Sequence, residues 1–471
     1  MLEGKVVLYP TTLVSHMVPM VQLAKLFIKH GISVEIAVIN SPTMPTSMTN
    51  FISKVSSTNP EISCNLLPPL PPPPKPFPNP YLTMLHTTQS NSTLLHSYLQ
   101  SQSKSGSIAA LVVDYFCVDA LDVAASLDIP AYIFFSSGAN VLAVFLRIPE
   151  LVPTWDKNDL GKNPVVIPGI PMLHVSDLPI RILQFDTEEH KLLMDIYRRM
   201  SKAKGILINT FESLEYGAVK TLKDWLSLST PLTPPAYCIG PLVTAADNKQ
   251  IANHPCLRWL DSQRKENVVL LAFGSVGNFS IEQLQEIAFG IEKSGQKFIW
   301  VVRNPETNSP DGKPYNPLAE PDLDALLPEG FMNRTKEQGI VMKSWAPQVE
   351  ILNHEAVGGF VNHCGWSSIL EAITNGVPII CWPLFAEQKM NRFLLVEEMK
   401  IGVKLKGCDE GFVSRDELAE KVRWLMESEG GKELRNNVHA HRINGLKALT
   451  EGGSSETALF KFLENLKLQN S

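Results

Sequence analysis

The sequence has little that would place the protein in or across a membrane. No stretch of the 471 residues reaches the ~18 uninterrupted apolar residues that a spanning helix needs. The most apolar region, 108–146, is interrupted by Asp114, Asp119, Asp122 and Asp128. The N-terminus, MLEGKVVLYP, lacks the basic segment, long apolar core and small-residue cleavage site of a signal peptide. We therefore expect a cytoplasmic protein with no integral membrane segment.

Paired cysteines and a strong charge of one sign are also missing. The seven cysteines are odd in number, scattered, and form no C-x-x-C pair, which is typical of reduced thiols in the cytosol. The net charge of −6 is modest and indicates no basic surface for nucleic acid. We expect a monomer that binds small molecules and no nucleic acid.

Several enzyme motifs are absent as well. Neither half has a G-x-G-x-x-G turn after its first strand, and there is no G-x-x-x-x-G-K-[ST] loop, so dinucleotide oxidoreductases and P-loop nucleotidases are disfavoured. Ser15 lies beside His16, but the sequence has no nucleophile elbow, which argues against a serine hydrolase. An Asp-x-Asp pair, Asp322 and Asp324, lies in a long polar insertion (303–327) and not at the end of a buried strand. We therefore predict no metal and no cofactor.

What is present is a repeated alternation of strand-like and helix-like segments. Residues 5–9 form a β-branched run, 17–29 have helical spacing, and 33–39 read as the next strand. Further strands of this half are expected at 110–114, 131–135 and 205–209. A second series is expected at 267–273, 298–302, 340–343, 359–362, 378–382 and 402–406. Ser280 and Gln283 predict a capping box that begins the first helix of this series.

This pattern predicts an α/β fold with two Rossmann-like, doubly wound domains that face a ligand cleft. The predicted domains are residues 1–241 and 256–450, joined by a polar linker at 242–255. A C-terminal helix at 451–471 is expected to cross back to the first domain. A proline-rich run at 67–80 predicts a rigid loop near the substrate mouth, and an SH3-type ligand is the less favoured reading.

His16 is the leading candidate for proton chemistry in the first half. It follows the first strand at the N-terminus of a helix, where the helix dipole disfavours imidazolium and leaves a neutral base. A carboxylate on the far side of the ring would fix its tautomer. Asp114, Asp119 and Asp122 lie close together in sequence, and spacing alone does not choose among them.

The second half carries residues suited to a sugar nucleotide. His363 to Ser368 lie between a strand and a helix, where Gly365 allows close approach of a phosphate and the helix N-terminus favours its charge. Ser275 follows a neighbouring strand. Glu371, one turn beyond Ser368, could accept hydrogen bonds from two ribose hydroxyls. Further candidates are Trp345 for stacking a base, and Glu387 and Gln388 for sugar hydroxyls.

Residues 345–388, WAPQVEILNHEAVGGFVNHCGWSSILEAITNGVPIICWPLFAEQ, resemble the signature of plant secondary-product glycosyltransferases along its full length. The whole chain resembles the plant UDP-dependent glycosyltransferases of small molecules, a family with the GT-B fold. LLPEGF at 326–331 and SWAPQ at 344–348 also resemble members that act on flavonoids and chalcones.

The resemblance implies a donor site in the second domain. Trp345 would stack on uracil, the Ala346 backbone and Gln348 would complete the uridine site, and Glu371 would hold the ribose. The implied diphosphate and sugar contacts are Ser275, His363, Ser368, Trp366, Glu387 and Gln388, with Gly365 and Ser367 in the same turn. The final glutamine of the signature goes with glucose, so Gln388 indicates UDP-glucose.

The resemblance also makes His16 the catalytic base. The family's partner aspartate would be Asp122, eight residues after Asp114, and Asp119 would have no catalytic role. Two positions depart from the family pattern. Ser367 replaces the usual asparagine, which puts one donor contact in doubt, and Ser15 replaces a common glycine before the histidine.

The expected reaction is inverting transfer of glucose from UDP-glucose to a hydroxyl of a flavonoid, chalcone or related phenolic. Plausible acceptor walls are Leu13, Val14, Phe116 and Val118. One alternative is carbon glycosylation of a polyphenol ring with the same donor. A non-catalytic sugar-nucleotide-binding protein is disfavoured, because His16 and Asp122 are both present. The acceptor and its hydroxyl position stay open.

Overall fold

The computed structural model of the chain describes residues 4–42, 44–73, 75–156, 158–228, 233–244, 254–305 and 320–469. It divides into two compact units. Unit 1 comprises Met1–Val243 with Lys447–Ser471, and unit 2 comprises Thr244–Leu446. Most of the predicted linker, from 245 to 253, lies outside the described residues. Within the described part of the chain, no helix has the length and apolarity to cross a membrane.

Unit 1 is built on a seven-stranded sheet in the order β3-β2-β1-β4-β5-β8-β9, and every pair in it is parallel. Its strands are β1 (Lys5–Tyr9), β2 (Ser33–Val38), β3 (Ser63–Leu66), β4 (Ile108–Asp114), β5 (Ala131–Phe135), β8 (Ile206–Ile208) and β9 (Ala236–Cys238). The chain leaves β1 to one side for β2 and returns to the other side for β4. The carboxyl ends of β1 and β4 therefore form the switch point, where ligands of doubly wound sheets bind.

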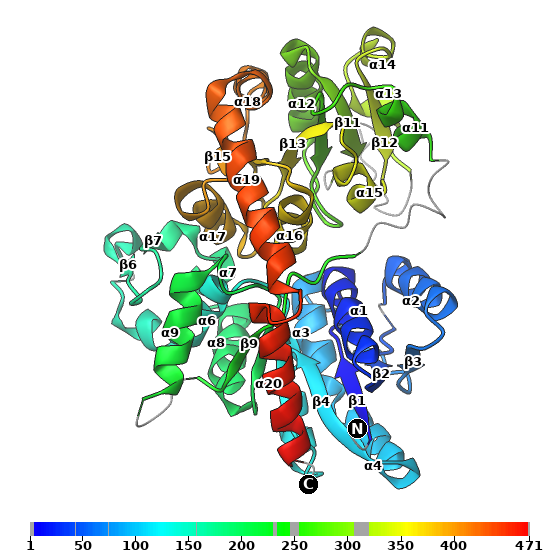
Figure 1. Cartoon of the computed structure of the whole chain (residues 1–471), viewed down its shortest axis with the longest axis vertical. Coiled ribbons are helices and arrows are strands. Elements are labelled where there is room, and N and C mark those ends of the chain that lie inside the picture. The colour runs from blue at the N-terminus through cyan, green and yellow to red at the C-terminus, as the bar shows by residue number, and fades with distance from the viewer. Residues whose placement is uncertain are drawn as a thin grey trace. The chain divides into compact units, whose positions relative to one another are not determined.

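Helices pack around this sheet (Figure 1). They are α1 (Val14–Lys29), α2 (Thr46–Thr58), α3 (Pro80–Ser90), α4 (Ser92–Ser105), α5 (Asp119–Ala125), α6 (Ala139–Leu151), α7 (Ile180–Leu183), α8 (Glu188–Arg199) and α9 (Tyr216–Leu226). A small antiparallel hairpin joins β6 (Pro164–Val165) and β7 (Leu173–His174). The proline-rich run leads into α3 at Pro80. The Asn79 side chain caps this helix and donates to Glu189 of α8 at 2.8 Å.

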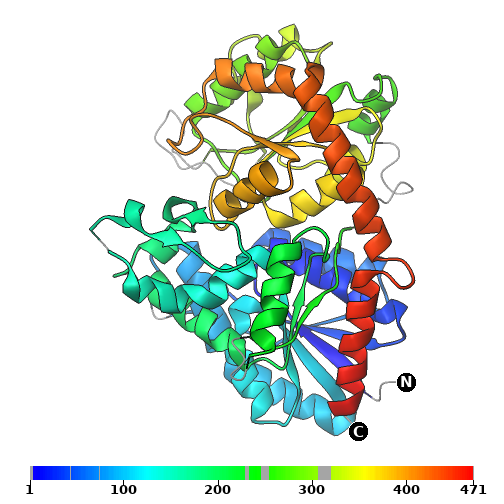
Figure 2. The ribbon, with the colours of Figure 1, turned by 60° about the vertical axis from the view of Figure 1, so that its left-hand side comes forward.

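The C-terminal helix α20 (Ser454–Gln469) is part of unit 1 (Figure 1 and Figure 2). Its apolar residues Leu459, Phe462 and Leu466 are buried in the core of unit 1. The Phe462 ring stacks on Phe27 of α1 at a centroid distance of 5.8 Å. The hydroxyl of Ser455 donates to the Gly240 carbonyl at 2.6 Å, which fixes the start of the helix.

Unit 2 has a six-stranded parallel sheet in the order β12-β11-β10-β13-β14-β15. Its strands are β10 (Val268–Ala272), β11 (Lys297–Val302), β12 (Gly339–Lys343), β13 (Val357–Asn362), β14 (Ile379–Cys381) and β15 (Gly402–Lys404). Its helices are α11 (Pro255–Asp261), α12 (Ile281–Ser294), α13 (Leu323–Leu326), α14 (Phe331–Arg334), α15 (Gln348–Leu352), α16 (Trp366–Asn375), α17 (Gln388–Phe393), α18 (Arg415–Glu427) and α19 (Glu429–Ala448). The switch point lies between β10 and β13.

The two doubly wound sheets confirm the predicted α/β class, but two local predictions need comment. The predicted capping box of α12 is only half formed. Ser280 accepts from the Gln283 N–H at 3.2 Å, whereas the Gln283 carboxamide donates to Val413 O and accepts from Val413 N. The Asp-x-Asp pair is a helix cap, because Asp322 accepts from the N–H groups of Asp324 and Ala325.

Candidate active site

The switch point of unit 1 brings a histidine and a buried carboxylate into contact. His16 lies in the first turn of α1, just after β1, and Asp114 is the last residue of β4. The His16 Nδ1 atom lies 2.7 Å from Asp114 Oδ2. Asp114 is fully buried, and its other oxygen accepts from the Phe116 N–H at 2.9 Å. The two strands are neighbours, so their carboxyl ends place these side chains together.

This geometry sets the chemistry of the imidazole. A carboxylate only accepts hydrogen bonds, so Nδ1 carries the proton and donates it to Asp114. The Nε2 atom is then the one that can take a proton from a substrate, and the carboxylate stabilises the imidazolium that results. The His16 side chain is 15 % exposed, which leaves it within reach of a ligand.

The structure corrects the expectation that Asp122 is the partner of His16. The Asp122 side chain is 57 % exposed and accepts from Arg199 at 2.7 Å and from Lys202 at 3.2 Å. Asp119 also pairs with Arg199, at 2.5 Å. Both aspartates project from α5 toward the end of α8, so they hold two helices together. Sequence spacing had left Asp114 as one of three candidates, and it is the carboxylate that contacts His16.

Aromatic rings lie against His16, where the acceptor walls were expected. The rings of Tyr115 and Phe116 lie 5.6 Å and 5.4 Å from the imidazole, measured between centroids. Leu13 and Val14 are half-buried at the start of α1, and the Leu13 carbonyl accepts from the His16 N–H. Val118 is 1 % exposed, so its side chain is part of the packed interior. It does not form the accessible acceptor wall that was expected of it.

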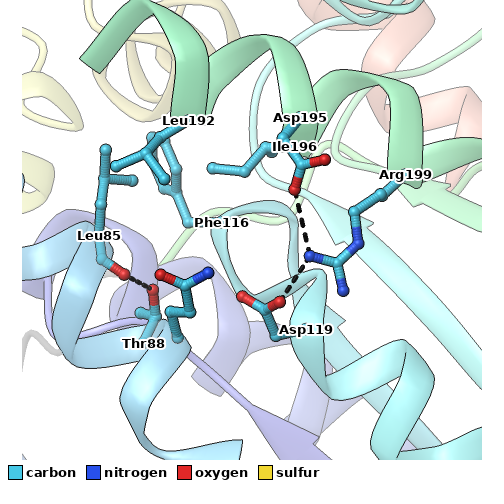
Figure 3. Close-up of a pocket in the computed structure, with 9 residues that line it drawn as sticks. Leu85, Thr88, Phe116, Asp119, Leu192, Asp195, Ile196 and Arg199 are labelled. Atoms are coloured by element: carbon cyan, nitrogen blue, oxygen red, sulfur yellow. Dashed lines mark hydrogen bonds and ion pairs between the residues drawn. The ribbon is translucent and has the colours of Figure 1, made fainter. Parts of the chain in front are cut away.

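Phe116 also lines a small pocket with a volume of about 20 Å³, room for about one water molecule, which is partly open to solvent (Figure 3). Its walls are Leu85, Thr88, Gln89, Phe116, Asp119, Leu192, Asp195, Ile196 and Arg199. Figure 3 shows the apolar side chains Leu85, Leu192 and Phe116 grouped at one end, and Arg199 between Asp119 and Asp195 at the other. One wall residue is thus shared between this pocket and the surroundings of His16.

In unit 2, two glycines enclose the ring of His363. A Cβ atom at Gly274 would lie 2.6 Å from His363 Nε2, and one at Gly365 would lie 2.4 Å from the same atom. Gly274 also has a φ of 77°, a conformation that favours glycine. Burial lowers the pKa of His363 to about 4, so the ring is neutral at physiological pH. Its Nδ1 atom has no hydrogen-bond partner within the described residues.

The turn before α16 is held by two asparagines. Cys364 has a φ of 63°, which is strained for a residue with a side chain. Its N–H donates to Asn362 Oδ1 at 2.7 Å, and its carbonyl accepts from Asn391 Nδ2 at 3.0 Å. Gly365 then caps α16 without a side-chain acceptor. The helix N-terminus is therefore open to an anion, and half-buried Ser367 and buried Ser368 lie in its first turn.

Glu371 and Gln348 form a polar pair beside this helix. Gln348 Nε2 donates to Glu371 Oε2 at 2.6 Å and to Ser368 Oγ at 3.0 Å. Burial raises the pKa of Glu371 to about 7, and the nearby charge of Glu350 adds to the rise. This carboxyl group can thus gain or lose a proton near neutral pH, and a diol that donates to it would favour its ionised form.

The remaining donor candidates lie at the carboxyl edge of the same sheet. Trp345 is 56 % exposed, with the His254 ring against its edge at 6.3 Å, and Ala346 is buried behind it. Exposed Ser275 follows β10. Trp366 is only 3 % exposed, so its indole offers little surface to a sugar.

Gln388 is oriented by backbone contacts. Its Oε1 accepts from the N–H groups of Leu384 and Phe385 at 2.8 Å and 3.0 Å. The carboxamide is therefore fixed with its NH₂ group as the end that can address a ligand, as a donor only. Glu387, the residue before it, can supply the acceptor that sugar hydroxyls also need.

Sequence reasoning missed Asn391, which lies three residues beyond the signature. It is fully buried on α17, the helix that begins at Gln388, and its contact to Cys364 joins that helix to the turn before α16. The signal in sequence was slight, because an asparagine in a helix is usually exposed. Asp114 was visible as a carboxylate at a strand end, and the switch-point rule favoured it.

Asn391→Ala leaves the Cys364 carbonyl unsatisfied in a buried turn, and an unpaired buried acceptor costs about 1–3 kcal/mol. We expect the Kd for UDP-glucose to rise by roughly 10-fold, as measured by calorimetry. Asn375→Ala is the control, because Asn375 also donates to a backbone carbonyl, that of Glu371, at the far end of α16. An equal loss in both variants would contradict a specific role for Asn391.

Comparison with known proteins shows the family of the chain. Residues 180–439 match the family described as UDP-glucoronosyl and UDP-glucosyl transferase. The chain is 41 % identical to anthocyanidin 5,3-O-glucosyltransferase of a Rosa hybrid cultivar and 38 % identical to isoflavone 7-O-glucosyltransferase 1 of Glycine max, with 98 % of each chain covered. Its structure is similar to that of Phytolacca americana UGT2 complexed with UDP-2fluoro-glucose and pterostilbene, with a TM-score of 0.88, 32 % identity and coverage of 98 % and 99 %. The chain therefore belongs to the family of plant UDP-dependent glycosyltransferases and is an enzyme that transfers a sugar from a UDP-sugar donor.

Proposed function

We propose that the enzyme transfers glucose from UDP-glucose to a phenolic hydroxyl of a flavonoid, chalcone or related acceptor. The observation that carries this proposal is the contact between His16 Nδ1 and Asp114 Oδ2, which leaves Nε2 as a base among aromatic rings. The named activities of the Rosa and Glycine relatives support a phenolic acceptor and a glucose donor. The oriented NH₂ group of Gln388 supports recognition of a hexose hydroxyl.

In the proposed reaction, His16 Nε2 removes the proton from the acceptor hydroxyl while Asp114 stabilises the imidazolium. The acceptor oxygen forms a bond to the anomeric carbon, and the bond from that carbon to the UDP oxygen breaks on the opposite face. An α-linked donor then gives a β-glucoside, and the proton leaves His16 to solvent. A positioned base contributes about 10²–10⁴-fold to the rate. Alignment of the substrates and stabilisation of the departing diphosphate must supply the rest.

The acceptor is proposed to lie against the rings of Tyr115 and Phe116, beside His16. Aromatic side chains at this position suit a flat phenolic ring, which can stack on them while its hydroxyl faces His16 Nε2. The pocket in Figure 3 is too small for a further ring, so it does not select among phenolic acceptors.

The test is a panel of flavonoids, chalcones, stilbenes and simple phenols incubated with UDP-glucose, and separately with UDP-galactose and UDP-glucuronate. We expect a gain of one hexose on phenolic acceptors with UDP-glucose, detected by mass spectrometry. Proton NMR should show a β-anomer, and acid should release the sugar, which distinguishes an oxygen glycoside from a carbon glycoside. Transfer only to non-phenolic acceptors, or only from another donor, would contradict the proposal.

Three further expectations remain proposals. A reducing compartment such as the cytosol is supported by the seven free cysteines, six of which are buried. A monomer is expected and can be measured by light scattering. Catalysis without metal is expected to survive EDTA, and among the described residues no three histidine, cysteine, aspartate or glutamate side chains gather as a metal site.

A further inference from the structure

Arg303 is a half-buried cation at the carboxyl end of β11, outside the signature and unused by the mechanism above. Within the described part of the chain, its guanidinium has no hydrogen bond and no ion pair with a carboxylate. Burial alone lowers its pKa, with no acidic neighbour to offset the effect. An arginine is rarely buried unless it is paired, since an unpaired buried charge is destabilising.

The sheet register places Arg303 between two turns of the donor site. Leu271 of β10 pairs with Trp300, and Val302 pairs with Lys343 of β12. Continuing both registers by parallel steps puts Arg303 level with Gly274 on one side and with Ser344 on the other. Neighbouring strands lie about 4.8 Å apart, so an arginine side chain can reach across either turn.

Those two turns carry candidates for different parts of the donor. His363 and Ser275 are candidates for the diphosphate. Gly274 lies against the His363 ring and directly precedes Ser275. Ser344, with a φ of 62°, turns the chain into Trp345, the candidate for the base. Along the carboxyl edge of the sheet, Arg303 therefore lies between Trp345, the candidate for the base, and Ser275, a candidate for the diphosphate. A nucleotide that contacts both sets of candidates would pass Arg303 between its base and its phosphates.

We propose that Arg303 binds the diphosphate of the nucleotide, as the cationic group of a donor site whose other diphosphate candidates are neutral. This inference rests on the assignment of unit 2 as the donor domain and not on the identity of the acceptor. His363 is neutral at physiological pH, and Ser275 and Ser368 are uncharged, so they supply dipoles only. A guanidinium offers paired N–H donors that match phosphate oxygens. The bound diphosphate would pair with the guanidinium charge, which has no partner within the described residues of the ligand-free protein.

The test compares UDP with uridine as ligands of the purified enzyme, by calorimetry. For Arg303→Met, we expect the Kd for UDP to rise about 10- to 100-fold, the range typical of a lost charge-assisted hydrogen bond. The Kd for uridine should change less than about 2-fold, because uridine has no phosphate. Arg303→Lys keeps the charge without the paired donors. Its Kd for UDP should lie between the values for the wild type and for Arg303→Met.

Thermal unfolding without ligand separates this role from a structural one. Removal of an unpaired buried charge should leave the Tm of Arg303→Met equal to or above that of the wild type, while the Tm shift produced by UDP shrinks. Lys343→Met is the matched control, because Lys343 is a 44 % exposed cation on the next strand, paired with Glu320 at 3.9 Å. This control removes one positive charge, as Arg303→Met does. It should leave the Kd values for UDP and for uridine within about 2-fold of the wild type.

Three results would overturn the proposal. They are equal losses for UDP and uridine in Arg303→Met, unchanged UDP binding in that variant, or a large fall in its Tm without ligand. If Arg303→Met does not fold, the same comparison of UDP with uridine in Arg303→Lys decides. None of these outcomes depends on which acceptor the enzyme glycosylates.

Discussion

Asp114→Asn lowers kcat for sugar transfer by about 10²–10⁴-fold, whereas Asp122→Asn keeps it within about 3-fold of the wild type. The reason lies in the two hydrogen bonds that the Asp114 carboxylate accepts, from His16 Nδ1 and from the Phe116 N–H. An asparagine at this position has one accepting oxygen and one donating NH₂ group. With its oxygen on the Phe116 N–H, its NH₂ group donates to His16 Nδ1, which moves the ring proton to Nε2 and removes the base. It also gives the imidazolium no negative charge.

The measurement is kcat with saturating UDP-glucose and a phenolic acceptor, together with the Kd for UDP-glucose. Because Asp114 lies in unit 1 and the donor candidates lie in unit 2, we expect the Kd to stay unchanged. Asp122→Asn is a matched control, since it removes a neighbouring carboxylate that pairs with Arg199 and Lys202. A larger loss of kcat in Asp122→Asn than in Asp114→Asn would show that the assignment made from the structure is wrong.

Glu371→Gln raises the Kd for UDP-glucose by about 10- to 100-fold and removes its dependence on pH between 6 and 8. Burial raises the pKa of Glu371 to about 7, and the ribose contact expected of this residue requires its ionised, accepting form. Binding by the wild type should therefore strengthen as the pH rises toward 7 and level off above it. UDP-glucose suits this test because its diphosphate is diesterified and stays fully ionised throughout this range.

Other titrating groups can be separated from Glu371. The pKa of His363 is about 4, so this ring stays neutral between pH 6 and 8. Glu350 contributes to the raised pKa of Glu371, and Glu350→Gln should shift the midpoint of the binding curve to lower pH. Binding that weakens as the pH rises through 7, or the same pH dependence in Glu371→Gln, would exclude this carboxyl as the ribose acceptor.

The raised pKa also has a consequence for stability. The folded-state pKa of about 7 lies above the ordinary glutamate pKa of 4.5, so the folded protein holds this proton more tightly than the unfolded chain does. Stability is therefore lost as the pH rises through this interval, and the loss is complete above pH 7. Glu371→Gln without ligand should have a higher Tm than the wild type at pH 8, and this advantage should disappear near pH 4.

The fold could be read from the sequence because its central strands are long and apolar. β4 (Ile108–Asp114) and β10 (Val268–Ala272) are β-branched or leucine-rich runs buried along their whole length, which is typical of central parallel strands. The edge strands β3 and β9 were not predicted. They are short, and Ser63–Leu66 is largely polar, so their place in the sheet depends on pairing with a neighbour and not on their own pattern.

The active site shows where a local pattern is insufficient. The donor candidates within 345–388 could be predicted together because the whole segment resembles one family signature, and in the fold they follow successive strands of one sheet. The partner of His16 could not be chosen by counting along the chain, because Asp122 projects from α5 toward Arg199 and away from the switch point. The roles inferred for Asn391 and Arg303 depend on contacts or registers between distant segments, which single-sequence patterns do not encode.

The most direct test of the account is the rate of hexose transfer from UDP-glucose to a phenolic acceptor by His16→Ala beside the wild type. The protein should be in EDTA, with both substrates saturating. We predict product with the wild type and a rate lower by about 10²–10⁴-fold with His16→Ala, while the Kd for UDP-glucose is unchanged. Equal rates for the two proteins would contradict the assignment of His16, held by Asp114, as the base of this enzyme.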